Sequence, residues 1–118
     1  MYNQNQIREA TGIALNAIWR WRQLLEDTDL YQIDDTGHVS YAPAFAVLMF
    51  ARAGARGKHI PDYLSAGEIA DAAQRWLEGE DVQMLGLGEL DRAEVLSALE
   101  LDHAASLEEA RREWEAMQ

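Results

Sequence analysis

Few side chains of this chain could support catalysis, and their spacing matches no catalytic or metal-binding pattern well. Asp35-Thr36-Gly37 has the form of the aspartic protease triplet, in which two aspartates share a proton and act as general acid and base. That chemistry needs an apolar strand before the triplet and a β-rich fold, whereas Asp34 precedes it here and most of the chain has helical patterns. His38, His59 and His103 lack the spacing that places two metal ligands on one helix face. We therefore expect no enzymatic activity, no metal site and no cofactor.

The composition is that of an ordinary globular domain. Hydrophobic residues make up 48% of the 118 residues and charged residues 26%, and the absence of cysteine excludes a disulfide framework. Residues 1–6 are polar and lack the layout of a signal peptide. The longest apolar run, Ala42 to Ala51, contains a proline and is too short to span a bilayer. We expect a cytoplasmic protein without membrane association.

The net charge of −11 is concentrated in the second half of the chain. Residues 1–60 contain six Lys or Arg and six Asp or Glu, whereas residues 61–118 contain four Arg and fifteen Asp or Glu. A nucleic-acid duplex is a dense line of phosphates, so the second half should face away from bound DNA or contact a different partner. We divide the chain into a unit at 1–60 and an acidic helical subdomain at 61–118, which together should form one compact domain.

Capping signals and apolar periodicity predict two short helices at the start of the chain. Asn3, with Gln6 three residues later, forms a capping box, and the first helix should end at Thr11-Gly12. A second helix, roughly Leu15 to Leu25, follows after a short glycine-containing turn, which is the helix-turn-helix pattern. Its inner face should be formed by Ile18, Trp21 and Leu25, while Asn16, Trp19, Arg20 and Gln23 point elsewhere.

The remaining elements are predicted from turn residues and further caps. Two β-prone runs, residues 30–33 and 38–41, flank the turn at residues 34–37 and predict a β-hairpin. Pro43 begins a third helix that Gly54 closes. Capping patterns predict later helices after Ser65, Asp91 and Ser106, with an apolar, glycine-containing connector at residues 84–88. The expected fold class is mainly α: a winged helix-turn-helix with a short β-hairpin, followed by a small C-terminal helical subdomain.

The segment from Gly12 to Trp21, which ends in Ile18-Trp19-Arg20-Trp21, resembles the second helix of AlpA/excisionase-type DNA-binding proteins. These proteins belong to the MerR-like winged helix-turn-helix superfamily, which places its wing and third helix where the hairpin and the Pro43 helix are predicted. The resemblance covers about residues 3–60 and implies a recognition helix in the major groove. Asn16, Trp19, Arg20 and Gln23 would then face DNA, with Arg22, Arg52, Arg56 and Lys58 available to phosphates.

The leading interpretation is a DNA-binding transcriptional regulator or architectural protein of phage or mobile-element type. It would act on double-stranded DNA as a homodimer, with the acidic half used for dimerisation or for recruiting a basic protein partner. Asp34-Asp35 stands where an arginine-bearing wing would be expected, and this favours an alternative, an acidic interaction or DNA-mimic module on a winged-helix scaffold. A third interpretation is the small subunit of a phage DNA-packaging enzyme, which uses such a domain.

The four tryptophans have different expected environments. Trp21 should pack in the core, whereas Trp19 could pack in the core or contact bases. Trp76 and Trp114, with Met117, are expected in the interior, and a dimer or partner face is the alternative for them.

Overall fold

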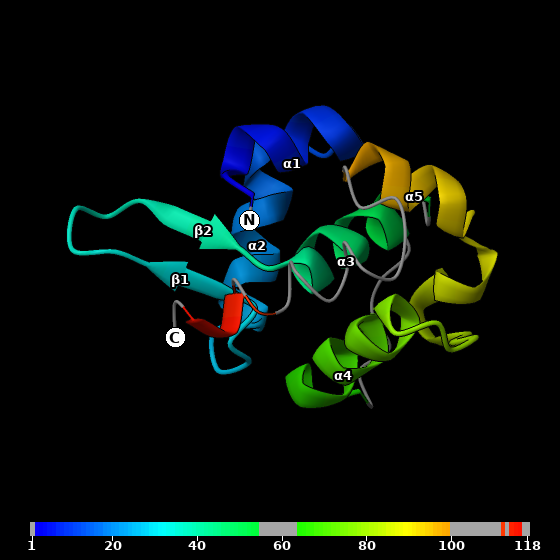
Figure 1. The fold of residues 1–118 in the computed structure, drawn as a ribbon. Helices are drawn as coiled ribbons and strands as arrows, with labels where there is room; N and C mark the ends of the chain where they lie inside the picture. The colour runs from blue at the N-terminus through cyan, green and yellow to red at the C-terminus, as the bar shows by residue number, and fades with distance from the viewer. Residues whose placement is uncertain (1, 55–63, 100–111, 113, 117–118) are drawn as a thin grey trace.

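A computed structural model describes residues 2–54, 64–99, 112 and 114–116 of the chain. Figure 1 shows a mainly helical molecule from which one β-hairpin projects. The elements are α1 (Gln4–Thr11), α2 (Leu15–Leu24), β1 (Tyr31–Ile33), β2 (Val39–Tyr41), α3 (Pro43–Gly54), α4 (Ala66–Leu77), the 3₁₀ segment η1 (Met84–Glu89) and α5 (Arg92–Ala98). This confirms the predicted mainly helical architecture with one short hairpin.

Helices α1 and α4 begin at the capping residues that the sequence predicts, and α1 ends at the predicted glycine. Asn3 and Gln6 form the predicted capping box of α1, each side chain accepting a hydrogen bond of 2.8 Å from the other residue's backbone N–H. Ser65 and Glu68 form the same reciprocal pair at the start of α4. Gly12 ends α1 with a φ of 74°, a conformation that costs glycine little because it has no Cβ. Local hydrogen bonding thus sets the starts of α1 and α4.

The hairpin is a two-stranded antiparallel sheet that the N-terminus extends. Tyr31 pairs with Tyr41, and Ile33 pairs with Val39. The backbone of Tyr2 also exchanges two hydrogen bonds with Tyr41, of 3.2 and 2.8 Å. The Tyr2 hydroxyl donates to the Leu99 carbonyl at 2.9 Å and so ties the start of the chain to the end of α5. Neither contact of Tyr2 was predicted from the sequence.

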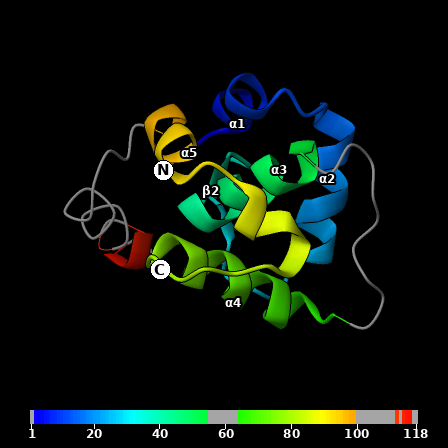
Figure 2. The same ribbon diagram turned by 90° about the vertical axis from the view of Figure 1, so that its right-hand side faces the viewer.

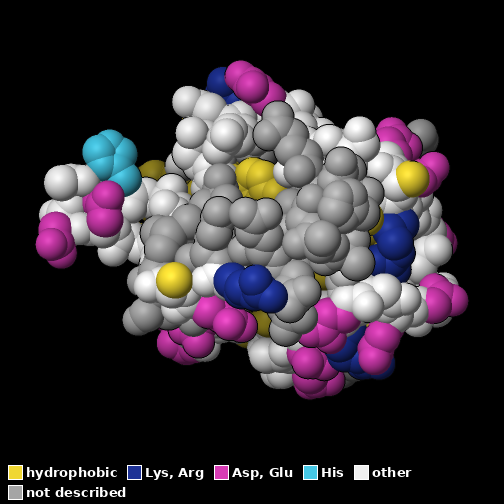
Figure 3. Space-filling model, in the orientation of Figure 1, with side chains coloured by type: hydrophobic (Ala, Val, Ile, Leu, Met, Phe, Trp, Pro, Cys, Tyr) yellow, Lys and Arg dark blue, Asp and Glu magenta, His cyan; other side chains and the backbone are white. Residues whose placement is uncertain are grey.

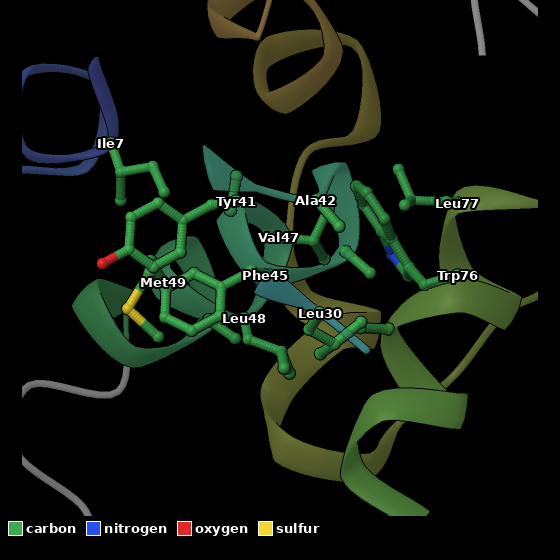
Figure 4. Close-up of a cluster of buried hydrophobic side chains, with 14 of the residues drawn as sticks. Ile7, Leu30, Tyr41, Ala42, Phe45, Val47, Leu48, Met49, Trp76 and Leu77 are labelled. Carbon is green, nitrogen blue, oxygen red and sulfur yellow. The ribbon is translucent and has the colours of Figure 1, made fainter. Parts of the chain in front are cut away.

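Helix α3 lies at the centre of the molecule, between α1 and α4 (Figures 1 and 2). Eight of its twelve residues are buried, because apolar side chains occupy most of the helix surface rather than a single stripe. The rings of Tyr41, at the end of β2, and Phe45, in the first turn of α3, pack against each other at a tilt of 41°, with centroids 4.6 Å apart (Figure 4). Trp76 of α4 is 2% exposed and belongs to the same core. One hydrophobic core therefore contains residues from both halves of the chain, and the division at residue 60 stays a prediction.

The second half confirms the predicted helices after Ser65 and Asp91. The connector predicted at residues 84–88 is the 3₁₀ segment η1, kinked where Leu85 and Gly86 have φ values of 62° and 77°. The last predicted helix, from Ser106, and Met117 lie largely or wholly outside the described residues. Trp114 is buried, as predicted, and its Nε1 donates to the Asp29 carbonyl at 3.1 Å. Among the described helices, none is long and apolar enough to cross a membrane.

Candidate nucleic-acid interface

The turn between α1 and α2 holds the two helices in a defined arrangement. The Gly12 N–H donates to the Arg8 carbonyl at 2.8 Å. The Thr11 hydroxyl donates to the Ile7 carbonyl at 2.7 Å and accepts from the Ile13 N–H at 3.3 Å. Ile7 and Ile13 are both buried, so the turn is anchored to the core on each side of Gly12. These contacts fix the direction in which α2 leaves the turn.

The N-terminus of α2 has no side-chain cap. Ala14 occupies the capping position in an extended conformation and has no side chain able to accept a hydrogen bond. The first N–H groups of a helix point along its axis, and the helix dipole makes this end favourable for a negative charge. The start of α2 is therefore electrostatically favourable for a phosphate.

Helix α2 has an apolar inner face and a polar outer face, as the periodicity predicts. Ile18 and Trp21 are 0% and 6% exposed. The side chains on the outer face are exposed, and they are Asn16, Trp19, Arg20 and Gln23. Figure 2 shows α2 at the periphery of the molecule, with α3 on its inner side. Trp21 therefore packs in the core as predicted, and Trp19, which is 53% exposed, lies outside it.

The guanidinium of Arg22 packs on the Trp19 ring instead of extending freely into solvent. Its guanidinium carbon lies 5.2 Å from the centroid of the Trp19 ring, which is the geometry of a cation–π contact. Arg22 is half-buried, while Arg20 is exposed. The structure thus brings Trp19 and Arg22 together as a pair and leaves Arg20 exposed on the outer face.

The tip of the hairpin is a hydrogen-bonded acidic turn. The Asp34 Oδ1 accepts hydrogen bonds from the backbone N–H groups of Thr36 and His38, both at 2.9 Å, and from the Thr36 hydroxyl at 2.7 Å. The Thr36 hydroxyl is also 2.6 Å from the His38 Nδ1. An aspartate that bonds the backbone two residues ahead is typical of tight turns. The predicted turn is therefore present, and Asp34 organises it.

The carboxylates at this tip carry negative charge into solvent. The hydrogen bonds from the Thr36 side chain and from the His38 backbone lower the pKa of Asp34 below its ordinary value. Asp35 is exposed next to it. Figure 3 shows the acidic side chains and a histidine together on the projecting part of the molecule. The hairpin tip is therefore anionic at neutral pH, and it would repel a phosphate backbone held close to it.

The other predicted phosphate contacts are only partly described. Arg52 lies in the last turn of α3 and is half-buried. Arg56 and Lys58 lie outside the described residues. In the described ranges, no three side chains of the metal-ligating types are grouped so that they could hold an ion.

The structure adds exposed apolar residues that sequence reasoning did not assign to the site. Leu15 is 38% exposed one turn before Trp19 on α2, and Ile33 is 57% exposed at the end of β1. The spacing of four residues between Leu15 and Trp19 places them on one helix face, and this signal was available in the sequence. The exposed surface of α2 is therefore mixed: amide and guanidinium groups lie beside the exposed apolar side chains of Leu15, Trp19 and Leu24.

No family model, curated protein or solved structure matches this chain. The resemblance of residues 3–60 to AlpA/excisionase-type proteins therefore stays a prediction.

Proposed function

We propose that the protein binds double-stranded DNA by inserting the outer face of α2 into the major groove, as a transcriptional regulator or architectural protein. In this proposal α1 and α2 act as a helix-turn-helix and β1–β2 as its wing. The observation that supports it most is the composition of the outer face of α2. Asn16, Arg20 and Gln23 are exposed there together, and the helix contains no acidic residue.

These side chains suit base edges for stereochemical reasons. A guanidinium donates two parallel hydrogen bonds to the O6 and N7 atoms of guanine, and an amide pairs with the N6 and N7 atoms of adenine. Each requires a side chain that extends from the helix without a competing partner nearby in the protein. Arg20 meets this requirement better than Arg22, because Arg22 stacks on Trp19. We therefore assign base contact to Arg20 and a supporting role to Arg22.

The direct test compares two arginine-to-alanine variants. A labelled random-sequence duplex library is titrated with protein at low salt, and the best-retained duplex is then measured at rising salt. The wild-type affinity should fall as salt rises, because each phosphate contact releases counterions. Arg20→Ala should lose about 1–3 kcal/mol of preference for the selected duplex over a scrambled one.

Arg75→Ala is the matched control for this test. It removes the same charge from α4, where Arg75 is paired with Glu80 and Asp71. It should leave the preference for the selected duplex unchanged. The proposal is wrong if the wild-type protein retains no duplex at low salt, or if the two variants lose preference equally.

A second candidate function is favoured by the hairpin tip. Asp34 and Asp35 project into solvent, and an acidic projection suits a basic protein or a peptide better than it suits DNA. On this alternative the chain is an acidic interaction or DNA-mimic module. It would displace a labelled duplex from an oligolysine peptide without itself retarding the duplex, whereas the leading proposal predicts retardation.

A further inference from the structure

An indole side chain exposed at the centre of a polar helix face needs a physical explanation. Trp19 is 53% exposed, and Leu15 lies one turn before it with 38% of its surface exposed. Exposing large apolar side chains to water is unfavourable, and adjacent exposed ones often mark a binding surface. Both residues lie on the same outer face of α2 as Asn16, Arg20 and Gln23.

The surroundings of Trp19 limit what could cover it. The Arg22 guanidinium lies 5.2 Å from the ring centroid, so a cation holds the indole in place and adds positive charge beside it. Arg20 follows directly, and no residue of α2 is acidic. The covering surface should therefore be negatively charged or rich in acceptors, with an apolar group opposite the indole.

The major groove of DNA has this combination of features. It is lined by phosphates and by acceptor atoms of the bases, and the C5-methyl group of thymine is the apolar group on its base edges. We infer that Trp19, held by Arg22, contacts a thymine methyl in the major groove and makes the protein prefer thymine at that position. Leu15 extends the same apolar area by one helical turn. This inference rests on the proposed DNA binding and deepens it by naming the base feature that the indole recognises.

The test replaces thymine with deoxyuridine, which pairs identically but lacks the methyl group. The duplex best retained from the random-sequence library is synthesised with thymine, or with deoxyuridine at every thymine position, and the affinity for each is measured by fluorescence anisotropy. Losing one buried methyl should weaken binding by the wild-type protein about fourfold, since that is the transfer free energy of one CH₂ group expressed as a ratio. More than one contacted methyl would give a larger ratio.

Variants of Trp19 separate a methyl contact from a general effect of deoxyuridine on the duplex. Trp19→Ala should bind the thymine duplex more weakly and should bind both duplexes equally. Trp19→Leu keeps an apolar side chain and should retain part of the ratio. Arg20→Ala is the matched control on the same face, because it should weaken binding while leaving the ratio between the two duplexes unchanged. Circular dichroism of each variant checks that α2 still folds.

The outcomes distinguish this inference from the proposal beneath it. If the wild-type protein retains no duplex, both are wrong. If it binds the thymine and deoxyuridine duplexes equally, DNA binding stands and the methyl contact is wrong. A full thymine preference in Trp19→Ala would also overturn the inference, because the preference would then come from another residue.

Discussion

Replacing the two tryptophans of α2 with alanine, one at a time, tests which face of this helix belongs to the core. Trp21 and Trp19 are two residues apart in the same helix, so both variants make the same chemical change in the same element. Trp21 is 6% exposed and packs in the hydrophobic core, whereas Trp19 is 53% exposed and contacts Arg22. The loss of stability should therefore differ greatly between them.

The magnitudes follow from what each indole contacts. Trp21→Ala removes a buried aromatic side chain and leaves a cavity, which costs about 3–5 kcal/mol. Trp19→Ala loses an exposed cation–π contact of about 0.5–1 kcal/mol and some apolar contact, partly offset by about 0.5 kcal/mol from the higher helix propensity of alanine. The net loss for Trp19→Ala should be below about 1 kcal/mol. Because a domain of this size has a total stability of about 5–15 kcal/mol, Trp21→Ala alone could leave a marginally folded protein.

Urea unfolding followed by far-ultraviolet circular dichroism measures both losses without relying on the fluorescence of the tryptophans being changed. The midpoint should shift strongly for Trp21→Ala and slightly for Trp19→Ala, with similar slopes against urea. Equal losses, or a larger loss for Trp19→Ala, would refute the assigned faces. The outer face of α2 could then no longer serve as the proposed interface.

Two further predictions concern the turn before α2 and the hairpin tip. Gly12→Ala should lower the free energy of unfolding by about 1 kcal/mol because the φ of Gly12 is 74°, although no atom lies within 4 Å of the added Cβ. Gly67 lies inside α4, and Gly67→Ala should instead raise the free energy of unfolding by about 0.5–1 kcal/mol. Thermal unfolding measures both, and the same sign for the two would contradict the backbone argument. The folded pKa of Asp34 lies below its ordinary value of 3.8, so its contribution to stability is present above pH 3.8 and is lost as the pH falls through the lower folded value. The backbone amide of Thr36 should report this titration by NMR, and a midpoint at or above 3.8 would show that the turn does not stabilise the carboxylate.

Features that depend on neighbouring residues were predictable from the sequence. The capping boxes that begin at Asn3 and Ser65, and the turn at Gly12, join side chains and backbone atoms that lie only a few residues apart in the sequence. The residue types at these positions are therefore enough to identify them. The inner face of α2 followed from apolar spacing, because Ile18 and Trp21 must face whatever core the chain builds. The hydrogen bonds that Asp34 accepts in the acidic turn were also predictable, because they come from residues at most four positions along the sequence.

Features that depend on distant residues were not predictable in this way. The pairing of Tyr2 with Tyr41 and its bond to the Leu99 carbonyl join segments far apart in the sequence, and no local pattern indicates them. Trp19 is a clearer example, because its position on α2 allowed either core packing or exposure. Only the arrangement of the other helices decides that Trp19 is 53% exposed. The site was thus outlined by periodicity, including the face shared by Leu15 and Trp19, but the exposure of Trp19 required the tertiary structure.

The acidic hairpin tip and the arginine-bearing helix are compatible with one DNA-binding surface because screening limits their interaction. Strand β1 extends from Tyr31 to Ile33, about 7 Å at about 3.3 Å per residue, and the turn that carries Asp34 and Asp35 follows its end. Charges in solvent are largely screened from one another beyond about 8 Å at physiological salt. In the proposed complex, the tip charges would therefore weaken phosphate contacts near the tip itself while acting little on contacts made beyond that range. The anionic tip then disfavours orientations that bring the hairpin against the backbone, so α2 has to supply the contact with the groove.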